Sequence, residues 1–164
     1  MTGESDRRFM LAAIAEAQKA REQGEVPIGA VAVREGQVIA RGHNRRIALS
    51  DVTAHAEMMC LRDLSSSLGL EFDLADVTVY STLEPCAMCA GAMIHHRVGR
   101  CLWGEQDLLL GADGSAMNIL SAHGVSSRGG LLRSECRRLL LDFFEEQLGR
   151  KSCSWEDIRL PEDS

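Results

Sequence analysis

The sequence predicts an α/β protein, a three-layer α/β/α sandwich around a mixed central sheet of about five strands. Short β-rich runs alternate along the chain with segments of helical periodicity, which is typical of strands and helices packed in layers. The first two strand candidates are joined by Glu35-Gly36, a hairpin signal. A hairpin pairs its strands antiparallel, whereas strands joined through helices favour parallel pairing, so we expect a mixed sheet.

The strand candidates are short β-rich runs separated by turn residues. Val77, Val79 and Ser81 alternate, as in a strand whose two faces differ. In chain order the five candidates span residues 28–33, 38–40, 77–81, 98–103 and, as a last strand, 130–133.

The helix candidates follow apolar periodicity. The first spans residues 6–23 and ends before Gly24. Others are expected at 54–64, from Pro85 to about His95, and at 134–148, since Pro is tolerated in a first helical turn. Loops are expected at 43–52, at 65–73 and over 111–128, with a short helix at 116–120 inside the last. We expect one domain over residues 1–149 and a polar, loosely ordered tail over 150–164.

Composition limits the protein class. No apolar run approaches the roughly 18–20 residues of a membrane span, and the N-terminus lacks a signal-peptide pattern, so we expect a cytoplasmic protein. The six cysteines are then expected to be reduced, with the close pair Cys86/Cys89 binding a metal or acting in redox chemistry. The net charge of −6 argues mildly against a protein that binds nucleic acid over its whole surface, because phosphate contacts need Lys and Arg.

Two segments carry the residue types of a metal site, Thr53-Ala54-His55-Ala56-Glu57 and Leu83 to Cys89. Cys86 and Cys89 are three residues apart, so on a helix their sulfurs share a face, and a helix N-terminus favours the thiolate. His55 adds a neutral nitrogen ligand. Zinc accepts this donor set, and three protein ligands leave a fourth position for water, whereas magnesium and calcium prefer oxygen.

Glu57 is the candidate catalytic residue. From a first helical turn its carboxylate can take a proton from water at the metal and return it to the substrate's ring nitrogen and leaving amine. A structural zinc site would need a fourth ligand, and neither Cys60 nor Cys101 comes with a pairing signal. A redox Cys-x-x-Cys pair would leave the His-Ala-Glu element unexplained. We therefore predict one catalytic zinc per chain, held by His55, Cys86 and Cys89.

These residues match the His-x-Glu and Pro-Cys-x-x-Cys signature of the cytidine-deaminase-like superfamily. Within it, the chain resembles the bacterial tRNA-specific adenosine deaminases from the first helix to about Phe144. The most specific match is the long stretch Thr82 to His95, and further matches are Glu25 to Val31, Asn44, Gly104 with Asp107, Gly111 to Ser115, and Asp142 to Phe144.

The resemblance implies a cytidine-deaminase-like fold and a homodimer that deaminates the wobble adenosine of a tRNA anticodon to inosine. It also implies three substrate contacts: Asn44 would hydrogen-bond the flipped nucleoside, the Ala56 backbone N–H would face the reacting base, and Asp107 would contact the sugar or its neighbourhood. A turn-stabilising role for Asn44 and a capping role for Asp107 remain alternatives.

Three stretches depart from the family's usual pattern. Val52 stands where the family usually has proline, and Leu108-Leu109-Leu110 follows Asp107, where a lysine and polar residues are usual. These leucines are either buried locally, the commoner case, or an exposed contact. From Glu145 onward six acidic residues face three basic ones, a poor surface for phosphates. Two basic clusters are expected to rim the metal site instead: Arg41, His43, Arg45 and Arg46, and His95, His96, Arg97 and Arg100.

Two other functions remain open. One is deamination of a free nucleobase, nucleoside or nucleotide of the guanine, cytosine or CMP/dCMP type, since a basic rim could hold a single phosphate. The other is a non-catalytic zinc or RNA-binding protein, against which the presence of Glu57 argues, because a pure binder has no use for a carboxylate beside the metal.

Overall fold

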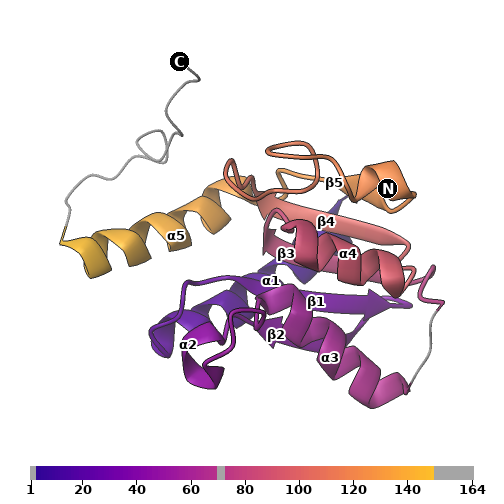
Figure 1. Cartoon of the computed structure of the whole chain (residues 1–164), viewed down its shortest axis with the longest axis horizontal. Coiled ribbons are helices and arrows are strands. Elements are labelled where there is room, and N and C mark those ends of the chain that lie inside the picture. Colours follow the sequence, from indigo (N-terminus) through magenta and orange to yellow (C-terminus); the bar gives the residue numbers. More distant parts are fainter. Residues whose placement is uncertain (1–2, 70–72, 150–164) are drawn as a thin grey trace.

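The chain folds around one central sheet with helices on both of its faces (Figure 1). The structure, a computed structural model, describes residues 3–69 and 73–149. Its elements are α1 (Glu4–Glu22), β1 (Gly29–Arg34), β2 (Gln37–His43), α2 (Arg46–Leu49), α3 (Ala56–Leu68), β3 (Thr78–Leu83), α4 (Ala87–His95), β4 (Arg100–Glu105), the 3₁₀ turn η1 (Ser121–His123), β5 (Ser126–Arg128) and α5 (Arg133–Leu148).

The sheet is mixed, as predicted, with the strand order β2-β1-β3-β4-β5. β1 pairs antiparallel with both β2 and β3, whereas β3, β4 and β5 run parallel. The β1–β2 hairpin turns at Glu35 and Gly36, whose φ angles are 50° and 73°. Two successive positive φ angles match the right-handed twist of a hairpin, and glycine adopts that conformation at little cost.

Both faces of the sheet are buried, which gives the three predicted layers. Along β1, Ala30 and Ala32 pack with α3 and α4 on one face, and the alternating Val31 and Val33 pack with α1 and α5 on the other. Figure 1 shows α3 and α4 together on one side of the sheet and α1 on the opposite side. The predicted fold class is confirmed.

The stretch after β4 differs from the sequence prediction. The last strand is β5 at Ser126–Arg128 and not 130–133, because Leu132 has a φ of 51°, a conformation that interrupts an extended chain. No helix forms at 116–120. The N–H groups of Ala116 and Met117 both donate to the carbonyl of Gly111, which closes a loop instead of the i to i−4 bonds of an α-helix.

Other element boundaries move by a few residues. The predicted loop at 43–52 contains the short helix α2, and α3 extends to Leu68, into the predicted connection at 65–73. Pro85 does not open α4 but precedes its first turn, because Cys86 is the extended residue before the helix. The predicted tail at 150–164 lies outside the described residues, so the division at residue 149 stays a prediction. Among the described helices none is long and apolar enough to cross a membrane.

Candidate metal centre and adjoining pocket

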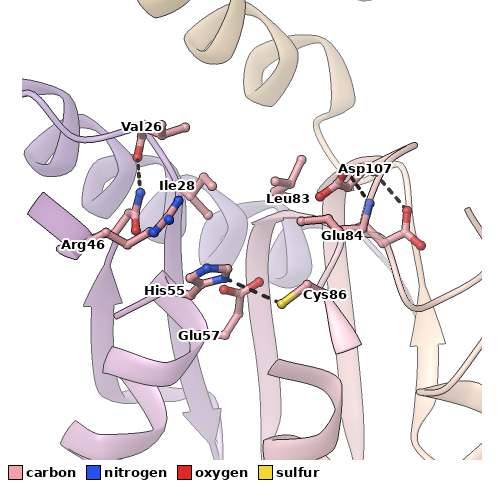
Figure 2. A pocket seen from close by; sticks show the side chains of 11 residues that line it. Val26, Ile28, Arg46, His55, Glu57, Leu83, Glu84, Cys86 and Asp107 are labelled. Atoms are coloured by element: carbon pink, nitrogen blue, oxygen red, sulfur yellow. Dashed lines mark hydrogen bonds between the residues drawn. The ribbon is translucent and has the colours of Figure 1, made fainter. Parts of the chain in front are cut away.

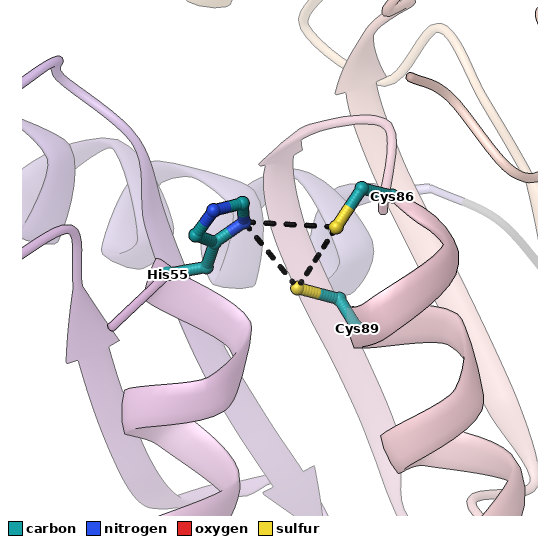
Figure 3. Close-up of side chains that lie close together, drawn as sticks. All are labelled: His55, Cys86 and Cys89. Carbon is teal, nitrogen blue, oxygen red and sulfur yellow. Dashed lines mark hydrogen bonds between the residues drawn. The ribbon is translucent and has the colours of Figure 1, made fainter. Parts of the chain in front are cut away.

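The first turns of α3 and α4 meet at a cluster of three metal-ligating side chains (Figure 3). His55 immediately precedes α3 and Cys86 immediately precedes α4, each with extended backbone, and Cys89 lies in the first turn of α4. The positive ends of both helices therefore face the cluster, which favours thiolates there. The structure brings together the three residues that the sequence predicts as ligands.

The spacing of these three side chains fits zinc. The Sγ atoms of Cys86 and Cys89 are 3.7 Å apart, and His55 Nδ1 lies 3.6 Å from the first and 3.7 Å from the second. Zinc bonds of about 2.3 Å to sulfur and about 2.0–2.1 Å to nitrogen at tetrahedral angles would separate the ligand atoms by about 3.5–3.8 Å. Among the described residues this group has no fourth member, and Cys60 and Cys101 lie outside it. Three ligands with one open position are the pattern of a catalytic zinc.

The same contacts shift the pKa values of the two cysteines and of His55. The neighbouring Cys89 thiol and the His55 imidazole lower the pKa of Cys86 to about 4, against the effect of burial. The pKa of Cys89 is raised by its contact with Cys86 and by burial. The contact with Cys86 raises the pKa of His55. Metal binding at this cluster would displace protons, as it does wherever thiolates are the ligands.

Glu57 lies beside the cluster and is almost fully buried, with 3% of its surface exposed. Its Oε1 accepts a hydrogen bond of 3.0 Å from the Ser81 hydroxyl, and its Oε2 lies 3.5 Å from Cys89 Sγ. Burial raises the pKa of this carboxyl. One oxygen of Glu57 is therefore fixed by Ser81, and the other faces the cluster of metal-ligating side chains.

A cavity of about 160 Å³ opens beside these residues (Figure 2). It is smaller than the roughly 300–1,000 Å³ of pockets that take drug-sized ligands, which suits a single flat heterocycle. His55, Glu57 and Cys86 lie at its base. Its walls are formed by Val26, Ile28, Asn44, Arg46, Leu83, Glu84, Asp107 and Leu110.

Asn44 lines this cavity and carries a buried polar atom without a hydrogen-bond partner. The residue is 4% exposed, and its backbone N–H donates to the Ile28 carbonyl at 3.1 Å. Its Nδ2 donates to the Val26 carbonyl at 3.4 Å, whereas its buried Oδ1 has no hydrogen-bond partner. A buried acceptor without a partner is costly unless a ligand supplies the donor.

The structure places Asp107 in the cavity wall and also gives it a capping role. Its Oδ1 accepts the N–H groups of Leu109 and Leu110, at 3.0 and 3.1 Å. This turn directs the leucines outward: Leu108, Leu109 and Leu110 are 38%, 43% and 57% exposed, so the commoner expectation of local burial is wrong. Ala56 is buried in the first turn of α3, where backbone N–H groups have no intrahelical acceptor, but it is not among the wall residues.

Sequence reasoning missed several residues of this region. In the sequence Ser81 is only part of a strand pattern, although a hydroxyl on a buried strand can indicate a hydrogen bond to a nearby catalytic residue. The sequence indicates only a basic cluster around Arg46, whereas the structure places Arg46 in the cavity wall. In the sequence Glu84 is only one residue of the stretch that matches the family, and nothing there indicates its role. In the structure it is a buried carboxylate in the same cavity wall.

The two basic clusters do not both surround the site. α4 starts at the metal cluster and ends at His95, so its nine residues carry His95 and the basic residues after it about 13 Å away. Arg100 pairs with Asp6 of α1 on the other face of the sheet. In the first cluster Arg41 and His43 both contact the buried Glu16. The predicted second rim is wrong, because the helix carries it away from the metal.

Comparison with known proteins decides the family. A family model of the cytidine and deoxycytidylate deaminase zinc-binding region matches residues 3–105. The chain belongs to this family. The predicted zinc cofactor and the predicted enzyme class, a zinc-dependent hydrolytic deaminase, are thereby confirmed.

Relatives of this deaminase also confirm the narrower resemblance seen in the sequence. The tRNA-specific adenosine deaminase of Bacillus subtilis is 41% identical over 93% of this chain and 97% of that protein. The chloroplastic tRNA(adenine(34)) deaminase of Arabidopsis thaliana is 44% identical over 85% of this chain, which spans only 12% of that longer protein. A solved structure from studies of A-to-I editing by tRNA:A34 deaminases superimposes with a TM-score of 0.75 at 41% identity, covering 81% of this chain and 99% of that one.

Proposed function

We propose that this deaminase converts the wobble adenosine of a tRNA anticodon to inosine. The observation that carries the proposal is the His55, Cys86 and Cys89 cluster with buried Glu57 at the base of a cavity sized for one base. The proposal draws its substrate from the relatives, which are named tRNA-specific adenosine deaminases. An anticodon loop is single-stranded, so moving one base into the cavity costs less than it would in a duplex.

In the proposed mechanism His55, Cys86 and Cys89 hold the zinc ion. Bound zinc would lower the pKa of water to about 7, which makes an effective nucleophile under mild conditions. Glu57 takes a proton from the attacking water and delivers it to the ring nitrogen beside the amine-bearing carbon. The oxygen of the attacking water bonds to that carbon. Its second proton passes through Glu57 to the amine, the carbon–nitrogen bond breaks, and ammonia departs to leave a carbonyl group. Ser81 fixes Oε1 of Glu57, so the proton travels on Oε2.

Three residues are proposed to bind the substrate. The unpaired Oδ1 of Asn44 accepts a hydrogen bond from an N–H or hydroxyl of the flipped nucleoside. The Ala56 N–H, in the first turn of α3, faces the reacting base. Asp107 uses Oδ1 for its own turn, which leaves Oδ2 for the sugar or its neighbourhood.

The active form is proposed to be a homodimer in the cytoplasm, where thiol ligands stay reduced. Light scattering on the zinc-loaded protein is expected to give twice the mass of one chain. A single-chain mass together with full activity would contradict the dimer.

The proposed activity is tested with an anticodon stem-loop RNA that carries adenosine at the wobble position. The matched control RNA has guanosine at that position and an adenosine elsewhere in the loop. Inosine, detected by reverse transcription and sequencing, is expected only at the wobble position of the first RNA.

A second candidate is deamination of a free base, nucleoside or nucleotide. The cavity is small, and Glu145, which has no ion pair among the described contacts, lies near the end of α5, where it would repel phosphates. Ammonia release from guanine, cytosine and CMP is therefore measured in parallel. Ammonia from one of these, with no inosine at any enzyme level, would reject the RNA substrate and favour this candidate.

A further inference from the structure

Glu84 is a buried carboxylate that the proposed mechanism does not use. It is 1% exposed and follows β3 directly, two residues before the ligand Cys86. Figure 2 shows its side chain pointing away from His55 and Glu57, toward the segment that carries Asp107. An ionised group buried at this depth is costly unless its oxygens are fully hydrogen-bonded.

All four of the carboxylate's partners come from one segment, residues 107–115. Oε1 accepts the N–H groups of Asp113 at 2.9 Å and Ser115 at 3.1 Å. Oε2 accepts the N–H of Asp107 at 3.1 Å and the hydroxyl of Ser115. Every partner is a donor, and only a carboxylate offers two oxygens able to accept all four bonds. Across residues 3–69 and 73–149, no Lys, Arg or His forms an ion pair with Glu84.

The segment wraps closely around Glu84. A Cβ built on Gly111 would lie 2.5 Å from Glu84 Cδ, so only glycine lets the backbone approach this far. The Ala112 N–H adds a bond of 2.8 Å to the Pro85 carbonyl. Asp107, whose backbone Glu84 holds, in turn orients Leu110 through its own side chain. A chain of contacts therefore runs from Glu84 to two residues of the cavity wall.

We propose that Glu84 is a positioning residue for the deamination: it fixes the segment 107–115 and so sets where Asp107 and Leu110 meet the substrate. The inference rests on the proposed function for its substrate and on the four hydrogen bonds for its mechanism. Although Glu84 lines the cavity, both of its oxygens are engaged by the segment 107–115, and none of its described hydrogen bonds goes to His55, Glu57, Cys86 or Cys89. Its loss therefore weakens substrate binding without changing the chemical step.

The test compares Glu84→Gln with Asp6→Asn. Glutamine keeps the size of Glu84 but turns an –NH2 group toward N–H donors. Asp6 is a comparably buried carboxylate, 4% exposed, that accepts bonds from Tyr80 and Arg100 on the α1 side of the sheet. Ser115→Ala removes a single hydroxyl donor and serves as the milder variant if Glu84→Gln fails to fold.

The kinetic result separates positioning from a general structural effect. With Glu84→Gln the KM for the stem-loop RNA is expected to rise about tenfold, with kcat within about twofold and zinc still at one per chain. Ser115→Ala is expected to raise KM about threefold, and Asp6→Asn to leave it unchanged. A fall in kcat with loss of zinc, or an equal rise in KM with Asp6→Asn, would overturn the proposal.

A double-mutant cycle tests whether Glu84 acts through Asp107. In an Asp107→Ala background, Glu84→Gln is expected to change KM by less than about twofold, because the contact it positions is already gone. The same tenfold change in both backgrounds would overturn that route.

Fluorescence provides a readout that needs no substrate. Trp103 is 8% exposed, and its Nε1 donates at 2.7 Å to Oδ2 of Asp113, a residue of the segment that Glu84 holds. In a Trp155→Phe background Trp103 is the only tryptophan. Glu84→Gln is expected to increase its quenching by iodide, and Asp6→Asn is not. If the parent enzyme forms no inosine, the proposed function fails, and unchanged quenching would separately reject the role of Glu84.

Discussion

Replacing Glu57 by glutamine is expected to abolish turnover while leaving the metal site intact. Ser81 donates to Oε1 of Glu57, so the amide oxygen of glutamine can keep that bond. The –NH2 group then occupies the position of Oε2, 3.5 Å from Cys89 Sγ, where it can donate to a sulfur but cannot carry a proton between water and substrate. General acid–base catalysis contributes about 10²–10⁴-fold, so we expect kcat to fall about 1,000-fold, or about 4 kcal/mol in the barrier.

The assay follows inosine formation under single-turnover conditions, with zinc measured on the same sample. Asp63→Asn is the matched control, since Asp63 is an exposed acid of the same helix whose carboxylate accepts only the Arg41 backbone N–H among the described hydrogen bonds. It is expected to keep normal turnover. Activity above about a tenth of the parent value in Glu57→Gln, at full zinc content, would refute the proton-carrier role.

Three further predictions concern the metal and the stability of the fold. Removing zinc by chelation is expected to lower the melting temperature and abolish activity, with both restored by Zn²⁺ and not by Mg²⁺; restoration by Mg²⁺ would contradict the donor set. Burial raises the pKa of Glu16, but hydrogen bonds from Lys19 and His43 outweigh it and the net pKa is lowered. Folding stability from this carboxylate is therefore present above its unfolded pKa near 4.5 and lost as the pH falls through the lower folded value. Urea unfolding of the parent is expected to weaken more between pH 6 and pH 3 than that of Glu16→Gln, and equal slopes would contradict this. Tyr80→Phe removes the 2.6 Å bond from Tyr80 to buried Asp6 and is expected to cost about 1–2 kcal/mol in the free energy of unfolding; a neutral change would show that the bond adds nothing.

The metal centre could be predicted from sequence because its geometry is encoded locally. His55 and Cys86 each sit immediately before a helix, and Cys89 follows at helical spacing, so short motifs fix most of the arrangement. The relative placement of the two motifs then follows from α3 and α4 packing on the same face of the sheet. Little long-range information beyond the fold class is needed to bring the ligands together.

The segment 107–115 could not be predicted in the same way. Most of the donors that Glu84 binds are backbone N–H groups 23 to 31 residues away, and every residue type except proline carries such a group. No pattern of side chains in the sequence therefore predicts that Glu84 binds this segment. Strand β5 could not be predicted for a similar reason. The polar residues Ser126–Arg128 are as typical of a loop as of a strand, and they form a strand because they pair in parallel with β4.

The surface charge around the site is also less hostile to RNA than the acidic end of the sequence indicates. Glu146 of α5 forms an ion pair with Arg21 of α1, so it does not present a free negative charge. Glu105 is fully buried and paired with Arg133 and Arg137. These pairings leave the net charge unchanged, but they place both carboxylates beside arginines, and Arg46 lies in the cavity wall. Because exposed charges are screened beyond about 10 Å, groups near the cavity, and not the total charge of −6, govern whether a phosphate is held there.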